Sequence, residues 1–363
     1  MFTLERSVAL APLTTLHVGG AAEALVRVRE AEQLKALPGL LSRSGLPWFI
    51  LGGGSNVYFA DGSVSRLIIK NELRGVTFTT VRPGVVRVEA AAGEDWDALV
   101  DATAQRGLSG FENLSGIPGT VGAAPIQNIN AYGAAVADTI VSVDAVHVES
   151  GTPRTFSAAE CAFGYRDSIF KHPDGAAYLV TRVCFELAAD AHPNLTYRSA
   201  SQSLAHTLAD TVPNGQPSVA DIRDAVLTVR RNIGMVAGIF NSAGSFFKNT
   251  IVSREQFERI HAIVASEFPE QNESLAPWHW ELPDGSVKIS TAFLMECTPY
   301  NKHAYAAGVE SPGTVALSPL HTLSIINRGG ASATDVRVFA SQISDAVAHI
   351  FGVELEPEVT YVA

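Results

Sequence analysis

The chain is poor in cysteine, with three thiols in 363 residues. Cys161, Cys184 and Cys297 are far apart, odd in number and form no C-x-x-C pair. A disulfide scaffold or a zinc site needs paired or closely spaced cysteines, so we expect free thiols in a reducing compartment. The ten histidines show no H-E-x-x-H or similar ligand spacing, and the sequence therefore predicts no bound metal.

The chain also lacks an excess of basic charge. Lys and Arg number 26 against 37 Asp and Glu, which gives a net charge of −11. This balance argues against nucleic acid or an anionic membrane as a general partner, while a local basic pocket stays compatible with it. No apolar run approaches the roughly 20 residues that span a bilayer, and residues 8–13, broken by Pro12, are too short for a signal peptide. We expect a soluble, cytoplasmic protein of two or three domains.

Local patterns favour mixed secondary structure. Apolar and charged residues alternate at 24–29 and 86–90, as in half-buried strands, and residues 48–51, 66–69, 139–148 and 178–187 are also β-rich. Helical spacing predicts helices over 96–106, 221–231 and 335–351, the second entered through Ser218-x-x-Asp221 and the third ending at Gly352. The fold class is therefore α+β. Polar, proline-bearing stretches at 188–218 and 299–319 indicate a boundary loop or lid and a second loop-rich excursion.

Residues 107–133 contain six glycines and two prolines but almost no charge. A solvated loop of this length normally carries several charged side chains. An uncharged, glycine-rich backbone instead indicates main chain laid close to a large group, with N–H groups available for anionic oxygens. The stretch predicts a wall for a phosphate-bearing cofactor; the alternative is a buried Gly/Ala packing segment.

A second glycine loop, Gly-Gly-Gly-Ser-Asn-Val at 52–57, follows the predicted strand 48–51. Such a loop can bind an anion through its backbone, with Ser55 and Asn56 as additional donors. Val57 occupies the third glycine position of the dinucleotide fingerprint, and the Walker A pattern is absent, so a Rossmann turn is excluded. The alternative interpretation is a plain tight turn.

Three further segments offer side chains for catalysis. Arg166, in Phe-Gly-Tyr-Arg-Asp-Ser, can bind a carboxylate in bidentate fashion, or simply pair with its neighbour Asp167. Ser245, in Ala-Gly-Ser-Phe-Phe-Lys-Asn, can donate a proton to a strongly basic carbanion or enolate, or be a helix N-cap. Glu358, in Leu-Glu-Pro-Glu-Val, can stay protonated in an apolar setting and stabilise an enolate, or lie in a surface turn.

In this order, the blocks resemble the UDP-N-acetylenolpyruvoylglucosamine reductase family over essentially the whole chain. The resemblance includes Thr-Leu-His-Val-Gly-Gly at 15–20, the two glycine loops, and the blocks at 164–171, 243–249 and 351–359. Each block alone is weakly specific, but six in register are highly specific. Leu-Thr-Tyr at 195–197 resembles the subclass with an added substrate-covering loop.

The resemblance implies an FAD-binding domain of the vanillyl-alcohol-oxidase (PCMH) type in two lobes, plus a C-terminal α+β substrate domain. The expected divisions are lobe 1 at 1–70, joined by the C-terminal segment 345–363, lobe 2 at 71–225 with a substrate loop at 188–218, and the substrate domain at 226–344. The resemblance also implies non-covalent FAD as cofactor, NADPH as co-substrate and a UDP-N-acetylglucosamine enolpyruvyl ether as substrate. We expect a monomer.

The resemblance further implies residue roles. Arg166 and Glu358 would stabilise negative charge on an enolate, and Ser245 would protonate the adjacent carbon. Tyr197 would close over the UDP diphosphate, with Tyr165, Arg166, Lys248 and Asn249 also contacting substrate. The residues expected to bind the cofactor are Gly52, Gly53, Gly54, Ser55, Asn56, Ser115, Gly116, Ile117, Pro118, Gly119, Thr120, Gly122, Ala123, Gln127, Ala131, Tyr132, Gly133 and Arg230.

The chain departs from the family pattern at a few positions. Ile233 stands where the family has a Lys, so Lys248 or Lys302 would have to compensate. Asn130 stands where Gly is common, which predicts a left-handed Asn, and Phe293 replaces a usual Trp. Two other readings stay open: a flavoenzyme of the same fold acting on a small hydroxy compound, and a non-enzymatic nucleotide-binding protein with a decayed site.

Overall fold

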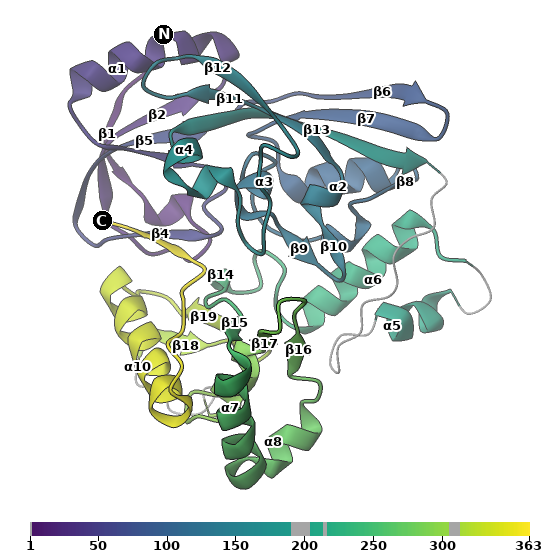
Figure 1. Ribbon diagram of the computed structural model, residues 1–363. Coiled ribbons are helices and arrows are strands. Elements are labelled where there is room, and N and C mark those ends of the chain that lie inside the picture. Colours follow the sequence, from purple (N-terminus) through teal and green to yellow (C-terminus); the bar gives the residue numbers. More distant parts are fainter. Residues whose placement is uncertain (1, 190–203, 213–215, 305–312) are drawn as a thin grey trace.

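The computed structural model describes residues 2–189, 204–212, 216–304 and 313–363. Two sheets in the N-terminal half and two smaller ones in the C-terminal half carry the architecture (Figure 1). The first sheet has the order β1-β2-β5-β3, in which β2, β5 and β3 run parallel. Its elements are β1 (Glu5–Ala9), β2 (Ala21–Val28), β3 (Trp48–Leu51), β5 (Ser63–Asn71) and helix α1 (Leu37–Ser44).

The second sheet is antiparallel, with the order β12-β11-β13-β7-β6 and β8 paired to β13. Its central strand is β13, whose alternating pattern buries Val183, Phe185 and Leu187 in the lobe's core. The elements of this part are β6 (Val76–Arg82), β7 (Val85–Ala91), α2 (Trp96–Ala104), β8 (Leu108–Ser109), α3 (Ala123–Gln127), β9 (Asn130–Ala131), β10 (Ala134–Ala135), β11 (Ile140–His147), β12 (Pro153–Ser157), α4 (Pro173–Ala176) and β13 (Tyr178–Ala189).

Helices α5 (Leu204–Thr211) and α6 (Val219–Asn232) connect this sheet to the C-terminal half. The predicted capping box opens α6, because Ser218 accepts from the Asp221 N–H and Asp221 accepts from that of Ser218. The C-terminal half packs two three-stranded sheets against long helices. Its elements are β14 (Asn241–Ser245), β15 (Thr250–Val252), α7 (Arg254–Glu267), α8 (Pro269–Ser274), β16 (His279–Glu281), β17 (Val287–Ile289), α9 (Thr291–Glu296), β18 (Val315–Leu317), β19 (Ser324–Asn327) and α10 (Ala333–Phe351).

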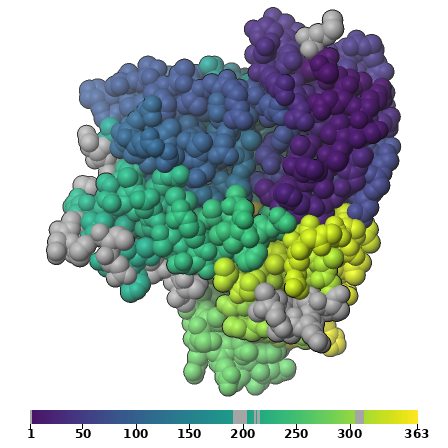
Figure 2. Space-filling model, turned by 180° about the vertical axis from the view of Figure 1, so that it is seen from behind, coloured from purple at the N-terminus to yellow at the C-terminus, as the bar shows by residue number. Residues whose placement is uncertain are grey.

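The C-terminal segment returns to the N-terminal half. Strand β20 (Thr360–Val362) pairs in parallel with β4 (Val57–Phe59), and Figure 2 shows the yellow C-terminal part lying against the purple N-terminal part. Asp61 reinforces this contact by accepting hydrogen bonds from the backbone N–H groups of Ala333 and Thr334 at the start of α10. The loop after β3 therefore lies next to the end of the chain.

The helices and strands expected from the sequence are confirmed, with ends shifted by a few residues. The prediction that Asn130 has a left-handed backbone is wrong. Asn130 lies in a short strand, and the positive φ angles belong to Asn128 (43°) and Tyr132 (49°) on either side of it. The predicted domain boundaries at residues 225 and 345 fall inside helices α6 and α10. The predicted division into domains stays a prediction. None of the helices in the described residues combines the length and apolar character that crossing a membrane requires.

Candidate active site

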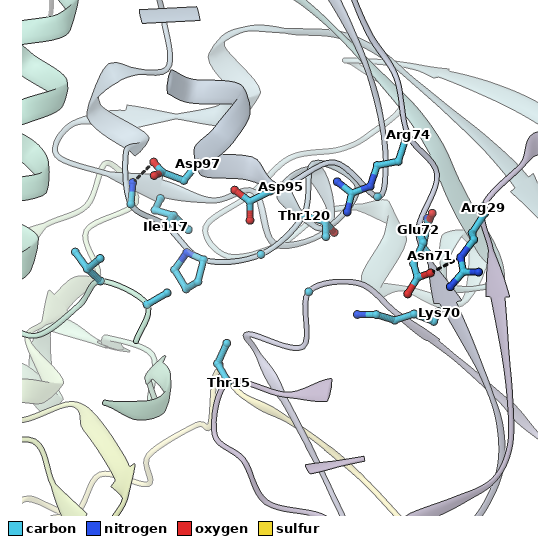
Figure 3. A pocket seen from close by; sticks show the side chains of 17 residues that line it. Thr15, Arg29, Lys70, Asn71, Glu72, Arg74, Asp95, Asp97, Ile117 and Thr120 are labelled. Atoms are coloured by element: carbon cyan, nitrogen blue, oxygen red, sulfur yellow. Dashed lines mark hydrogen bonds and ion pairs between the residues drawn. The ribbon is translucent and has the colours of Figure 1, made fainter. Parts of the chain in front are cut away.

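A cavity of about 810 Å³ lies where the first sheet, the second glycine loop and the start of α2 meet (Figure 3). Six of the predicted cofactor residues line it: Gly53, Gly116, Ile117, Pro118, Gly119 and Thr120. Lys70, Asn71 and Glu72 line it from β5, and Asp95 and Asp97 from the start of α2. A cavity of this size, walled by main chain and polar groups, has room for a dinucleotide-sized ligand.

The two glycine loops are held against each other. A methyl group added at Gly53 would lie 2.7 Å from Cα of Gly119, so only glycine fits there. The hydroxyl of Ser55 donates to the Pro118 carbonyl at 2.9 Å. In the loop at 107–133, the Gly116 N–H donates to Asp97 at 2.6 Å. These contacts keep bare backbone at the cavity wall, which suits the close approach of a pyrophosphate.

The remaining predicted cofactor residues lie behind this wall or at other edges. Asn56 reaches the C-terminal segment, where its side-chain amide donates to the Glu358 carbonyl at 3.1 Å. Ser115 is fully buried, and its hydroxyl donates to the carbonyl of Glu112. None of the following lines the cavity: Gly52, Gly54, Ser55, Asn56, Ser115, Gly122, Ala123, Gln127, Ala131, Tyr132 and Gly133.

Arg230 lies in a second cavity of about 110 Å³, which shares Thr15, Pro118 and Val236 with the larger one. Its side chain comes from the end of α6, is 7% exposed, and donates to the Met235 carbonyl at 2.7 Å. Burial lowers the pKa of Arg230, and a hydrogen bond with Tyr132 opposes this shift. Among the described residues its Nε has no hydrogen-bond partner, so the guanidinium retains a buried donor beside the cavity.

Ser245 lies at the end of β14, beside the second cavity. The preceding Gly244 lines that cavity and has a φ of 78°, a conformation that favours glycine. Ser245 pairs in register with Ser324 of β19, and its side chain is half-buried. The alternative role as a helix N-cap is wrong, because Ser245 belongs to a strand.

The C-terminal segment brings Glu358 to the same place. The Glu358 N–H donates to the Phe246 carbonyl at 2.8 Å, and the Lys248 N–H donates to the Glu356 carbonyl at 3.0 Å. Glu358 therefore lies against the residue that follows Ser245. Burial raises the pKa of the Glu358 carboxyl, while the nearby cations Arg166, Lys171 and Lys248 act in the opposite direction. The interpretation as an exposed surface turn is wrong for Glu358, whose side chain is 13% exposed.

Arg166 completes this group. Its Nε lies 3.0 Å from Oε1 of Glu358, and its backbone has a φ of 52°, which is uncommon outside glycine. The alternative pairing with Asp167 is wrong, because Asp167 instead contacts His172 at 2.8 Å. Lys171 donates to the Arg166 carbonyl at 2.8 Å and so braces the strained turn. Arg166 thus contacts Glu358, and Glu358 bonds to the residue that follows Ser245, next to the smaller cavity that Gly244 lines.

Three of the predicted substrate residues, Tyr165, Lys248 and Asn249, lie close to this group. Tyr165 is 40% exposed and is hydrogen-bonded to Asn249, and burial of its hydroxyl raises the pKa of Tyr165. Lys248 pairs with Glu356. Tyr197 lies outside the described residues.

Sequence reasoning missed three residues near the site. Lys288 of β17 lies 5.3 Å from the Tyr165 ring centre and 5.4 Å from that of Trp280, and burial lowers its pKa. His321 has a buried Nδ1 without a partner in the described residues, and burial lowers the pKa of His321 to about 4. Lys70 lines the large cavity. A single Lys in an alternating strand gives no signal of burial, and His321 lies just beyond the predicted loop-rich stretch at 299–319, in no motif of its own.

No three His, Cys, Asp or Glu side chains gather as a metal site within the described ranges. The cavity, its glycine-only contacts and its bordering arginine fit a large phosphate-bearing cofactor. Residues 22–157 match the family model of an FAD binding domain, and residues 235–362 match that of the UDP-N-acetylenolpyruvoylglucosamine reductase C-terminal domain. The fold and the cavity therefore define a flavoprotein with an FAD-binding domain of the PCMH type and a C-terminal α+β domain, as the sequence predicted.

Full-length relatives narrow this class. The chain is 40% identical to UDP-N-acetylenolpyruvoylglucosamine reductase of Thermobifida fusca, over 97% of this chain and 96% of that protein. It is 39% identical to the enzyme of Saccharopolyspora erythraea, over 96% and 93%. The chain belongs to the UDP-N-acetylenolpyruvoylglucosamine reductase family. The crystal structure of the reductase from Thermus caldophilus covers 100% of both chains with a TM-score of 0.62 at 24% identity, which supports the shared fold.

Proposed function

We propose that this protein reduces UDP-N-acetyl-3-O-(1-carboxyvinyl)glucosamine to UDP-N-acetylmuramate, with FAD as cofactor and NADPH as reductant, in peptidoglycan precursor synthesis. The observation that carries the proposal is the convergence of Arg166, Glu358 and the end of β14, whose Gly244 lines the smaller cavity that adjoins the cofactor cavity. Membership in the family of named reductases supports the substrate. When bound, FAD supplies an acceptor and donor of hydride.

The residues at this edge have distinct roles in the proposed reaction. Hydride addition to the terminal vinyl carbon leaves negative charge that spreads into the substrate carboxylate as an enolate. The Arg166 guanidinium holds that carboxylate, and the Glu358 carboxyl, whose pKa is raised by burial, donates a hydrogen bond to it in its protonated form. Ser245 then donates its proton to the carbon next to the carboxylate, which completes the reduction of the double bond. An enolate carbon is basic enough to take a proton from a serine hydroxyl.

Charge near the site supports an anionic substrate. In a chain with a net charge of −11, Arg166, Lys171, Lys248 and Lys288 gather around Glu358 and Tyr165. Lys288 is the cation least committed to a carboxylate, since the structure gives it aromatic contacts and no ion pair within the described residues. We assign Tyr165, Lys248, Asn249 and Tyr197 to substrate binding, as expected from the sequence. Ile233 caps the end of α6 and offers no charge for this purpose.

A first experiment tests the function. The purified protein should show a flavin absorption spectrum, and NADPH absorbance at 340 nm should fall when the enolpyruvyl substrate is added. Loss of NADPH without dependence on this substrate would favour another flavoenzyme of the same fold. A protein that binds no flavin would refute both.

A second experiment tests Ser245. In Ser245→Ala, reduction of the flavin by NADPH should be unchanged, while its reoxidation by substrate should slow by roughly 10²- to 10⁴-fold, the usual contribution of a general acid. Stopped-flow flavin absorbance measures both half-reactions. Ser266→Ala in α7, an exposed hydroxyl that donates to the Ile263 carbonyl, is the matched control and should behave as wild type. Equal slowing of both half-reactions would mean that Ser245 has a structural role.

We also propose that the protein works as a cytoplasmic monomer. Its three cysteines are free, two of them buried, as suits a reducing compartment. Light scattering of the purified protein tests the monomeric state. Fractionation of the source cells tests the cytoplasmic location.

A further inference from the structure

Lys70 is a half-buried lysine that lines the large cavity. It lies in β5 between Ile69, which is fully buried, and Asn71, which is 6% exposed. Its Nζ donates to the carbonyl of Gly52, the first residue of the glycine loop. Figure 3 shows the amine end of the side chain directed toward the middle of the cavity. The cation is therefore placed where the loop meets the open space.

The two arginines of this cavity already have carboxylate partners, while Asp95 caps α2 by accepting from the Ala98 N–H at 2.9 Å. Arg29 pairs with Glu72 at 2.9 Å, and Arg74 pairs with Glu94 at 3.0 Å, both at the exposed rim. On the opposite wall, Asp97 is neutralised by Arg223 from α6.

Lys70 differs from these groups. In the part of the chain that the structure describes, no carboxylate lies within ion-pair distance of it. Burial lowers the pKa of its ammonium, and Glu72 only partly compensates. A partly desolvated cation held by a neutral carbonyl gains when an anion joins it. The cavity thus contains one cation whose charge is not yet matched.

Bound FAD brings a matching charge to this cavity. Its pyrophosphate carries two negative charges, while the glycine loops offer backbone N–H groups, which supply hydrogen bonds but no net charge. A lysine ammonium is a compact point charge suited to phosphate oxygens. We propose that Lys70 neutralises the FAD pyrophosphate and, through its bond to the Gly52 carbonyl, positions the glycine loop at 52–57 around it. This inference rests on the cavity being the FAD site.

Titration of the apoprotein with FAD, followed by flavin fluorescence, tests the proposal. Lys70→Met removes the charge and keeps most of the side-chain length, and it should raise the Kd for FAD about tenfold or more. Lys70→Arg should retain most of the affinity. Lys35→Met, which removes an exposed charge outside the cavity, should bind FAD as the wild type does. Far-UV circular dichroism checks that each variant is folded.

Competition distinguishes phosphate from adenosine recognition. ADP and adenosine serve as competitors that displace FAD from the apoprotein. In Lys70→Met the affinity for ADP should fall as much as the affinity for FAD. The affinity for adenosine should change less than twofold. Equal losses for ADP and adenosine, or an unchanged Kd for FAD, would overturn the assignment of Lys70. A wild-type apoprotein that binds no FAD would instead overturn the proposed function itself.

Discussion

The contact between the two glycine loops predicts a specific loss of cofactor affinity in Gly53→Ala. The added methyl would lie 2.7 Å from Cα of Gly119, 3.1 Å from its carbonyl carbon and 3.4 Å from the Thr120 nitrogen. Carbon atoms normally approach to about 3.5–4.0 Å, so the loops must part by roughly 1 Å. The obstacle is backbone and cannot rotate away. Overpacking of this kind costs about 1–3 kcal/mol.

This cost should appear in binding rather than in folding. Without cofactor the loops can part and relax, whereas bound FAD requires them at their native separation. A cost of about 1–3 kcal/mol corresponds to a Kd for FAD raised roughly 5- to 150-fold. Fluorescence titration of apoprotein measures it. The control is Gly39→Ala in α1, where the methyl would meet only the flexible end of Arg43 and helix propensity improves. A Kd within twofold of wild type in Gly53→Ala would refute this reasoning.

Two further predictions concern charged groups. Arg223→Met should lower the free energy of unfolding at pH 7 by about 2–3 kcal/mol. The substitution leaves the partly buried carboxylate of Asp97 without its cation partner. Since the pairing with Arg223 helps lower the pKa of Asp97 despite its burial, this stabilisation is present above the ordinary pKa of Asp and lost as the pH falls through the lowered one. Urea unfolding at pH 7 and at acidic pH should therefore show the wild type and the variant converging in acid; a constant difference would contradict the ion pair as its source. In Glu358→Gln, the flavin reoxidation rate should lose the decline that the wild type shows as the pH rises through the raised pKa of Glu358, because an amide does not ionise. For the same reason the wild-type fold should lose stability over that pH range, and the variant should not. Stopped-flow rates and urea unfolding across pH measure the two effects, and a decline that persists in Glu358→Gln would assign it to another group.

The sequence predicted the pieces of the site better than their assembly. The strands and helices followed from alternation, helical spacing and capping residues, which are local signals. Arg166, Ser245 and Glu358 were each singled out from their neighbours, but each had an equally simple structural alternative. The alternatives for Arg166 and Ser245 are excluded by the Asp167–His172 contact and by the position of Ser245 in strand β14. The alternative for Glu358 is excluded by a long-range feature, the bridge that the C-terminal segment forms with Phe246 and Phe247. No local pattern encodes such a pairing.

Residues missed by the sequence analysis share a physical reason. Lys70 and Lys288 lie in strands where a lysine ordinarily indicates a solvated face. Their burial comes from segments distant in the chain: the glycine loop over Lys70, and Tyr165 over Lys288. The mistaken left-handed Asn130 has a related cause, since a glycine-rich pattern shows that a turn is present but not which residue takes the positive φ. The roles of the predicted site residues stay predictions until the variants are measured.

The electrostatics of Glu358 link substrate binding to proton availability under the proposed function. In the free protein, burial favours the neutral carboxyl, while Arg166, Lys171 and Lys248 favour the carboxylate. An entering substrate brings a carboxylate and a diphosphate, which engage these cations and displace water from the cleft. Both changes weaken the influences that favour ionisation, so the pKa of Glu358 should rise further in the complex. The same cations that attract the anionic substrate thus release Glu358 to its neutral, hydrogen-bond-donating form when the substrate arrives.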